Sequence, residues 1–142
     1  MTMDEDFIAD VLTFEEVTEG ICVAVQSYFL KDQSDPDIGQ FIWAYRIKIS
    51  NESTLPTQLL SRHWIITDGR GQVSEVKGEG VIGEQPLIQP GQNFSYTSGS
   101  PLATPSGFMH GTYEMIDSEN RIFTVAIPAF SLDSPYCSQN IN

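Results

Sequence analysis

The chain has 142 residues and a formal net charge of -12, which suits one domain built around a single core. Such an acidic chain has no long-range attraction for nucleic acid. It contains no apolar run of membrane-spanning length, and its acidic N-terminus lacks the basic and apolar regions of a secretory signal. We therefore expect a cytoplasmic protein that neither binds nucleic acid nor inserts into a membrane.

The acidic residues are concentrated at the N-terminus. Seven of the 19 acids precede Gly20, and no Lys or Arg lies among them. From Gly20 onward 12 acids face 7 bases, so the body carries a net charge of only -5. We expect residues 1–19 to form a solvated acidic lead-in, with at most a short helical turn or the approach to a strand from Val17. A regulatory arm is the alternative. Residues 136–142 are expected to form a C-terminal tail.

After Gly20 the apolar residues follow a period of two, as in half-buried antiparallel strands. The segment 41–50 is the clearest case, because its odd-numbered positions are all apolar or aromatic. Residues common in turns, such as Asp68-Gly69, separate the segments. The pattern predicts an all-β sandwich of the immunoglobulin or fibronectin type III kind, with a closed barrel as the alternative. About seven strands are expected, at 21–30, 41–50, 58–67, 71–78, 93–98, 111–116 and 121–130.

The stretch KGEGVIGEQP, residues 77–86, contains the spacing G-x-G-x-x-G at Gly78, Gly80 and Gly83. A dinucleotide fingerprint needs a helix directly after the glycines, and the prolines at 86 and 90 prevent one. The glycines are therefore expected to serve an irregular strand connection. The alternative is a nest of backbone amides for an anion. Glu79 and Glu84 would oppose a phosphate, unless a Mg²⁺ ion bridged them to it.

Arg62, His63 and Trp64 form a polar and aromatic cluster on the strand expected at 58–67. Arg62 and Trp64 share one face, and His63 takes the other. An Arg62 side chain that reached the glycines would supply the positive charge that they lack. The simpler expectation, which we prefer, is that Trp64 belongs to the core and the stem of Arg62 packs along the sheet.

The residues that usually bind metals or catalyse reactions are few. Cys22 and Cys137 are expected to be free thiols, and neither they nor His63 and His110 show the spacing of a metal site. No nucleophile motif is present. We expect neither an enzyme nor a metal site or cofactor, and Mg²⁺ only together with a phosphate ligand.

Long segments of the chain resemble the ApaG family. They are QSDPD (33–37), FIWAYRIKISN (41–51), QLLSRHWIITDGRGQVSEVKGEGVIGEQPLIQPG (58–91), YTSGSPLATPSGFMHGTYEM (96–115) and FTVAIPAFSL (123–132). The resemblance implies an ApaG domain over residues 20–135 with a fibronectin type III-like sandwich. It also implies an indirect association with cobalt resistance and magnesium efflux, and a domain that serves protein interaction in eukaryotic F-box adaptors and a DNA-polymerase-interacting protein. The family provides no catalytic set to transfer.

Two functional hypotheses follow. The first is a non-enzymatic module that binds a protein partner, as the fold and the adaptor context suggest. The second is a sensor of a nucleotide or pyrophosphate, with Gly78, Gly80, Gly83 and Arg62 as ligand-binding residues. Exposed sandwich edges allow a monomer or a dimer, and the sequence does not decide between them.

Overall fold

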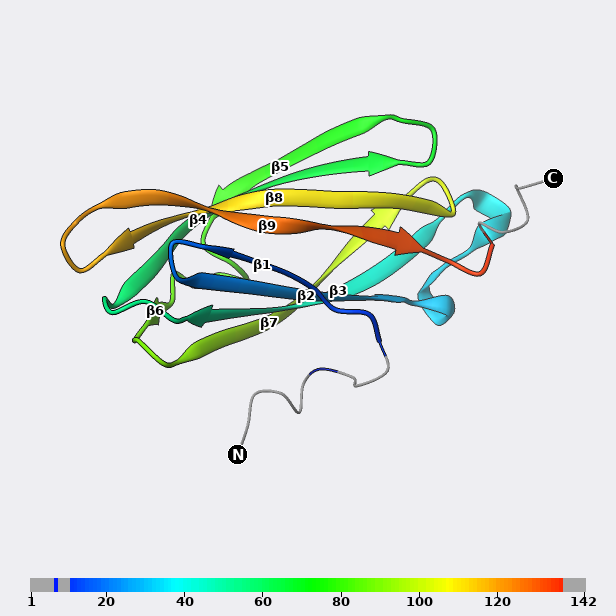
Figure 1. The fold of residues 1–142 in the computed structure, drawn as a ribbon. Coiled ribbons are helices and arrows are strands. Elements are labelled where there is room, and N and C mark those ends of the chain that lie inside the picture. Colours follow the sequence, from blue (N-terminus) through cyan, green and yellow to red (C-terminus); the bar gives the residue numbers. More distant parts are fainter. Residues whose placement is uncertain (1–6, 8–10, 137–142) are drawn as a thin grey trace.

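The computed structural model describes residue 7 and residues 11–136, which form a sandwich of two antiparallel sheets (Figure 1). The first sheet has the order β1 (Phe14–Thr18), β2 (Ile21–Phe29), β3 (Phe41–Asn51), β7 (Asn93–Leu102). The second has the order β5 (Val73–Glu79), β4 (Thr57–Asp68), β8 (Ser106–Asp117), β9 (Ile122–Asp133), and β6 (Leu87–Ile88) also pairs with β4. Two short 3-10 turns, η2 (Lys31–Gln33) and η3 (Pro36–Ile38), connect β2 to β3. This confirms the predicted all-β sandwich. None of the described residues belongs to a helix long and apolar enough to cross a bilayer.

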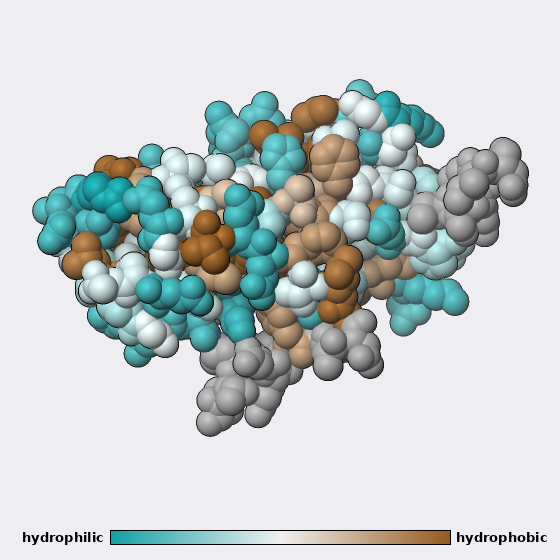
Figure 2. All heavy atoms as spheres, in the orientation of Figure 1, coloured by the Kyte–Doolittle hydropathy of each residue, from teal (hydrophilic) through white to brown (hydrophobic). Residues whose placement is uncertain are grey.

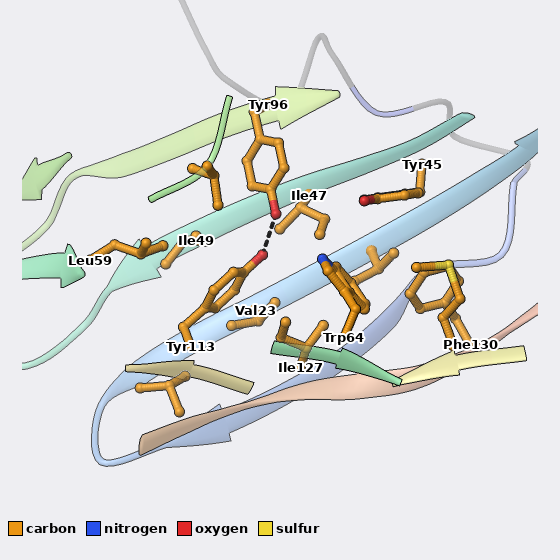
Figure 3. Close-up of a cluster of buried hydrophobic side chains, with 14 of the residues drawn as sticks. Val23, Tyr45, Ile47, Ile49, Leu59, Trp64, Tyr96, Tyr113, Ile127 and Phe130 are labelled. Carbon is orange, nitrogen blue, oxygen red and sulfur yellow. Dashed lines mark hydrogen bonds between the residues drawn. The ribbon is translucent and has the colours of Figure 1, made fainter. Parts of the chain in front are cut away.

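The core lies between the two sheets and follows the alternation in the sequence. Along β3 every second side chain is buried, from Phe41 to Asn51. Trp43, Tyr113 and Phe130 are among the largest fully buried side chains. Burial of an apolar side chain of this size contributes about 1.5–3 kcal/mol, so the facing rings and branched chains supply most of the stability. Figure 3 shows part of this cluster, in which Trp64 packs edge-on against Tyr45 and Phe130.

Two described strands were not expected, and one lies within the lead-in. Residues 14–18 form β1, which pairs with β2 from Phe14 opposite Val25 to Thr18 opposite Ile21. Phe14 packs against the core, and the Oγ1 atom of Thr18 accepts a hydrogen bond from the Ala126 amide at 3.2 Å. The folded unit therefore begins before Gly20. The second strand, β6, has only two residues and shows no alternation that could reveal it.

The other end of the chain also extends the fold. Tyr136 packs against Phe29 and Phe41, with ring centroids 6.0 Å apart in both pairs. The first residue of the expected tail is thus part of the packed structure, while 137–142 lie outside the described residues. Cys22 is a free thiol, as expected, and the expectation for Cys137 also falls outside the described part.

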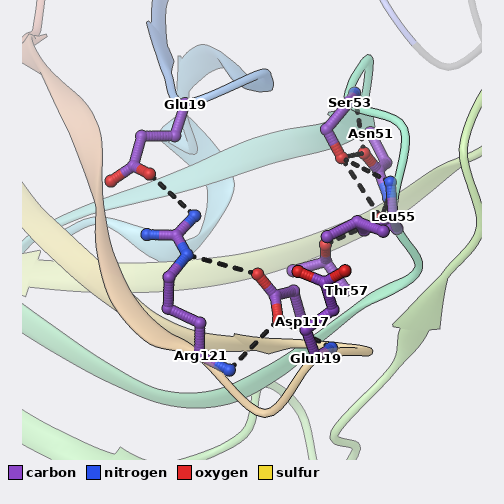
Figure 4. Close-up of polar contacts among 8 residues, drawn as sticks. All are labelled: Glu19, Asn51, Ser53, Leu55, Thr57, Asp117, Glu119 and Arg121. Carbon is purple, nitrogen blue, oxygen red and sulfur yellow. Dashed lines mark hydrogen bonds and ion pairs between the residues drawn. The ribbon is translucent and has the colours of Figure 1, made fainter.

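A carboxylate network closes the turn between β8 and β9 (Figure 4). The Oδ1 atom of Asp117 accepts hydrogen bonds from the amides of Glu119 at 2.9 Å and Arg121 at 3.1 Å. Arg121 pairs with Asp117 and with Glu19 beside β1, so the network also links this turn to the start of β2. The hydrogen bond from the Arg121 amide is the main reason that the pKa of Asp117 lies below its ordinary value.

The lowered pKa of Asp117 predicts an acid-dependent loss of stability. Its contribution to the free energy of unfolding is fully present above the ordinary aspartate pKa of about 4 and is lost as pH falls through the folded pKa. Asp117→Asn is therefore expected to be less stable than the wild type at neutral pH, with the difference shrinking in acid. Urea unfolding over a pH series measures this. Asp133→Asn makes the same charge change at an exposed strand end, and an equal pH profile for both variants would contradict the assignment.

Candidate functional site

The three glycines lie in a tight loop at the edge of the second sheet. We name residues 78–85 the glycine loop. Its tip is a two-residue turn in which Val81 and Glu84 exchange backbone hydrogen bonds of 2.8 and 2.9 Å. The central residues, Ile82 and Gly83, have φ of 42° and 79°. Positive φ at both central positions is the mark of a type I′ turn, so the loop is a small hairpin rather than a phosphate cradle before a helix.

A different structural feature requires glycine at each position of the motif. Gly78 lies opposite Arg62, and a Cβ atom there would come within 2.9 Å of the guanidinium group. Gly80 has φ of 63°, and its Cβ would lie 2.2 Å from the carbonyl oxygen of Glu84. Gly83 needs only the positive φ, because nothing lies within 4 Å of its Cβ position. The expectation that the glycines serve an irregular connection therefore agrees with their surroundings.

Arg62 reaches the glycine loop, so the expectation that only its stem packs along the sheet is wrong. Its Nη1 atom donates to the carbonyl oxygens of Gly80 at 2.8 Å and Glu79 at 3.2 Å. Arg62 shares its face of β4 with Trp64, as alternation predicts, and a β-bulge between Leu59 and Ser61 turns both to the same side as Leu59. Trp64 is buried in the core, as expected.

The polar groups of the loop are largely used within the protein. The amides of Gly80, Val81 and Glu84 donate to backbone carbonyls, and Arg62 donates to two more. A hollow of about 310 Å³ beside the loop is lined by Glu79, Gly80, Gly83, Glu84 and Gln85. Its two carboxylates disfavour a phosphate and favour a cationic group. A nucleotide or pyrophosphate site at these residues stays a prediction.

The histidines lie apart from the loop hollow. His63 and His110 belong to the neighbouring strands β4 and β8, where His63 pairs with Thr112 and His110 with Ile65. The Nε2 atom of His63 lies 2.7 Å from Glu75 Oε1, and the His110 ring stacks on Phe108. In the part of the chain that the structure describes, no group of three or more His, Cys, Asp or Glu side chains could hold a metal ion.

Ile82 is the feature that sequence reasoning missed. This β-branched residue occupies the left-handed region, and 55% of its surface is exposed. Type I′ turns ordinarily place Asn, Asp or Gly at this position. The available signal was the pair Ile82-Gly83, which ends the glycine motif in a place where Asn-Gly would be expected.

Comparison with known sequences shows which family contains this loop and fold. The family model described as the ApaG domain matches residues 31–117, which include β3, β4, β5 and the whole glycine loop. The chain belongs to the ApaG family. This confirms the resemblance seen in the sequence.

Individual ApaG relatives match over most of their length. The chain is 53% identical over 129 residues to Protein ApaG of Paramagnetospirillum magneticum, covering 91% of this chain and 99% of the relative. A crystal structure of an ApaA protein from Bordetella pertussis is similar with a TM-score of 0.79 at 47% identity, covering 81% of this chain and 94% of the other. The structural-genomics target SoR45 gives a TM-score of 0.77 at 41% identity, covering 82% and 88%. These similarities support the sandwich and carry no statement about activity.

Proposed function

We propose that this ApaG protein is a non-enzymatic, cytoplasmic binding module whose glycine loop engages a protein partner. The observation that carries the proposal is the conformation of Ile82. Its left-handed backbone is unfavourable for a β-branched residue, and its side chain is mostly exposed, so it gains little burial within its own fold. Strained residues of this kind often mark functional sites.

The surroundings of Ile82 specify the chemistry of the partner. Glu79 and Glu84 are exposed and line the neighbouring hollow, and Leu87 is exposed just beyond the loop. We expect the partner to provide an apolar pocket for Ile82, with basic side chains at its rim that meet the two carboxylates. Bonds from Arg62 to the loop carbonyls hold this surface in one conformation before binding, which limits the entropy lost on association. Any link to cobalt resistance or magnesium efflux would then act through the partner.

Recognition of a nucleotide or pyrophosphate is the second candidate function. The observation in its favour is that the guanidinium group of Arg62 reaches Gly78 and Gly80. Titration of the wild type with pyrophosphate and Mg²⁺ separates the two functions. A rise in melting temperature that Arg62→Gln abolishes would support the small ligand. An unchanged melting temperature would count against the small ligand and favour recognition of a protein by the loop.

Ile82→Asn is expected to separate binding from stability. Asparagine tolerates positive φ, so the variant should be as stable as the wild type or more stable by up to about 1 kcal/mol. Loss of an apolar anchor should weaken partner binding by roughly tenfold or more. Affinity capture from the native cell, followed by titration with the recovered partner, measures binding, and urea unfolding measures stability.

Ile122→Asn is the matched control, because Ile122 is 56% exposed at the start of β9 and is not among the residues with positive φ. Capture by this variant should equal that of the wild type. The proposal fails if the wild type repeatedly recovers no stoichiometric partner, or if Ile82→Asn binds as tightly as Ile122→Asn.

A further inference from the structure

β5 is the free edge of the second sheet. Within the described chain it pairs only with β4, along one of its two sides. Every residue of it except Gly78 is exposed, and its apolar members Val73 and Val76 are 58% and 41% exposed. Figure 2 shows hydrophobic atoms at the upper rim, where β5 runs in Figure 1. An open edge of this length is a template for another strand.

The other long strands at sheet edges, β1, β9 and β7, are protected. β1 and β9, which end the two sheets on the same side, lie against each other, and the Ala126 amide there donates to Thr18. β7 ends the first sheet on the other side and contains Gly99 and Pro101. Pro101 has no amide hydrogen to donate to an added strand, and Gly99 has no side chain to pack against one, so β7 is a poor template. β5 contains no proline, so it is the edge best able to accept a strand.

The ladder between β4 and β5 determines which backbone groups face outward. The Gly80 amide donates to Leu60 at 2.8 Å, and the Asp68 amide donates to Gln72 at 3.0 Å, so both ends of the ladder are bonded pairs. Bonded and non-bonded pairs alternate along antiparallel strands. The residues of β5 whose amides point away from β4 are therefore Val73, Glu75, Lys77 and Glu79.

The sequence of β5 is complementary to itself in one antiparallel register. If Val76 lies on a two-fold axis, Glu75 faces Lys77 of the second copy, and the same pair recurs on the other side of the axis. These residues carry outward amides, so each pair also exchanges two backbone hydrogen bonds. A shift to either neighbouring bonded register would place Glu75 opposite Glu75, or Lys77 opposite Lys77. Charge therefore selects the register centred on Val76.

We propose that β5 pairs with β5 of a second copy of this chain, antiparallel and with Val76 on the two-fold axis. The two second sheets would then form one sheet of order β9-β8-β4-β5-β5-β4-β8-β9. The net charge of -12 on each copy opposes association at long range. At physiological ionic strength this repulsion is screened beyond about 8 Å, whereas the contacting Glu75–Lys77 pairs are not. The proposal does not depend on partner binding by Ile82.

Charge exchange tests the register directly. Glu75→Lys and Lys77→Glu each place like charges opposite each other in a homodimer, so each variant alone should dimerise roughly tenfold more weakly than the wild type. An equimolar mixture should recover wild-type dimerisation, because both facing pairs become attractive again. Sedimentation velocity of the full chain over a range of concentrations measures all three samples.

A disulfide at the axis provides an independent test. Facing residues of a non-bonded pair have Cα atoms about 4.5 Å apart, within the range of disulfides. In a background with Cys22→Ser and Cys137→Ser, oxidised Val76→Cys should form a covalent dimer. Ser74→Cys should not, because Ser74 faces Gly78 of the second copy. The proposal is overturned if the wild type stays monomeric at every concentration, if the charge variants do not restore each other, or if both cysteine variants crosslink equally.

Discussion

Replacing Gly80 by alanine is expected to lower the free energy of unfolding by about 2–4 kcal/mol. Two effects add. The left-handed backbone, with φ of 63°, disfavours any residue with a Cβ atom. The new Cβ would also lie 2.2 Å from the carbonyl oxygen of Glu84, which is backbone and is fixed by the turn at Val81. Urea unfolding, with secondary structure followed by circular dichroism, gives the value.

Gly83→Ala is the matched control for this prediction. Gly83 has φ of 79° and open space around its Cβ position, so it isolates the backbone effect at about 1 kcal/mol. The difference between the two variants measures the steric contact alone. If they were equally destabilised, the packing of Gly80 against Glu84 would not hold in solution. A mutation of Gly80 is also a poor test of ligand binding, because it disturbs the fold of the loop itself.

Removing the hydroxyl of Tyr113 is expected to lower the free energy of unfolding by about 1–3 kcal/mol. The hydroxyls of Tyr113 on β8 and Tyr96 on β7 lie 2.5 Å apart between the sheets and point toward each other (Figure 3). Both side chains are buried, so Tyr113→Phe leaves the buried Tyr96 hydroxyl without this partner. Thermal and urea unfolding of the variant measure the loss.

The double variant with Tyr96→Phe and Tyr113→Phe supplies the control. It should lose less than the sum of the two single variants, because no buried hydroxyl is left unpaired. Burial also raises the pKa of both tyrosines, so the wild type should lose stability as pH rises above the ordinary tyrosine pKa of about 10. The double variant should lose less stability over the same rise in pH. Strict additivity of the single losses would contradict a hydrogen bond between the sheets.

The sequence predicted those parts of the fold that depend on alternation. β3 was recognisable because every second side chain from Phe41 to Asn51 is buried, and a period of two has no other common explanation. β1 was not, since its sequence FEEVT contains two adjacent acids and relies on pairing with β2 for its conformation. β6 is too short to show a period and exists only because β4 provides its partner.

The site was predictable in its residues and not in its geometry. The spacing of Gly78, Gly80 and Gly83 marked the loop, and the absence of a following helix excluded a dinucleotide site. The shared face of Arg62 and Trp64 follows from alternation, but the bulge between Leu59 and Ser61, which turns both to the side of Leu59, has no clear signature in a single sequence. The positions of the Glu79 and Gly80 carbonyls that the guanidinium group meets have none either, so this contact required the structure.

The strand β1 has a practical consequence for how fragments of this protein are chosen. The family model ends on both sides inside the folded unit, at residues 31 and 117, whereas strands continue from Phe14 to Asp133. A fragment cut at those limits would lack β1, β2 and β9, and so would expose the core faces of the strands that remain. The part that the family model matches is thus smaller than the smallest piece expected to fold alone. Expression of an isolated ApaG domain should start before Phe14 and extend beyond Tyr136.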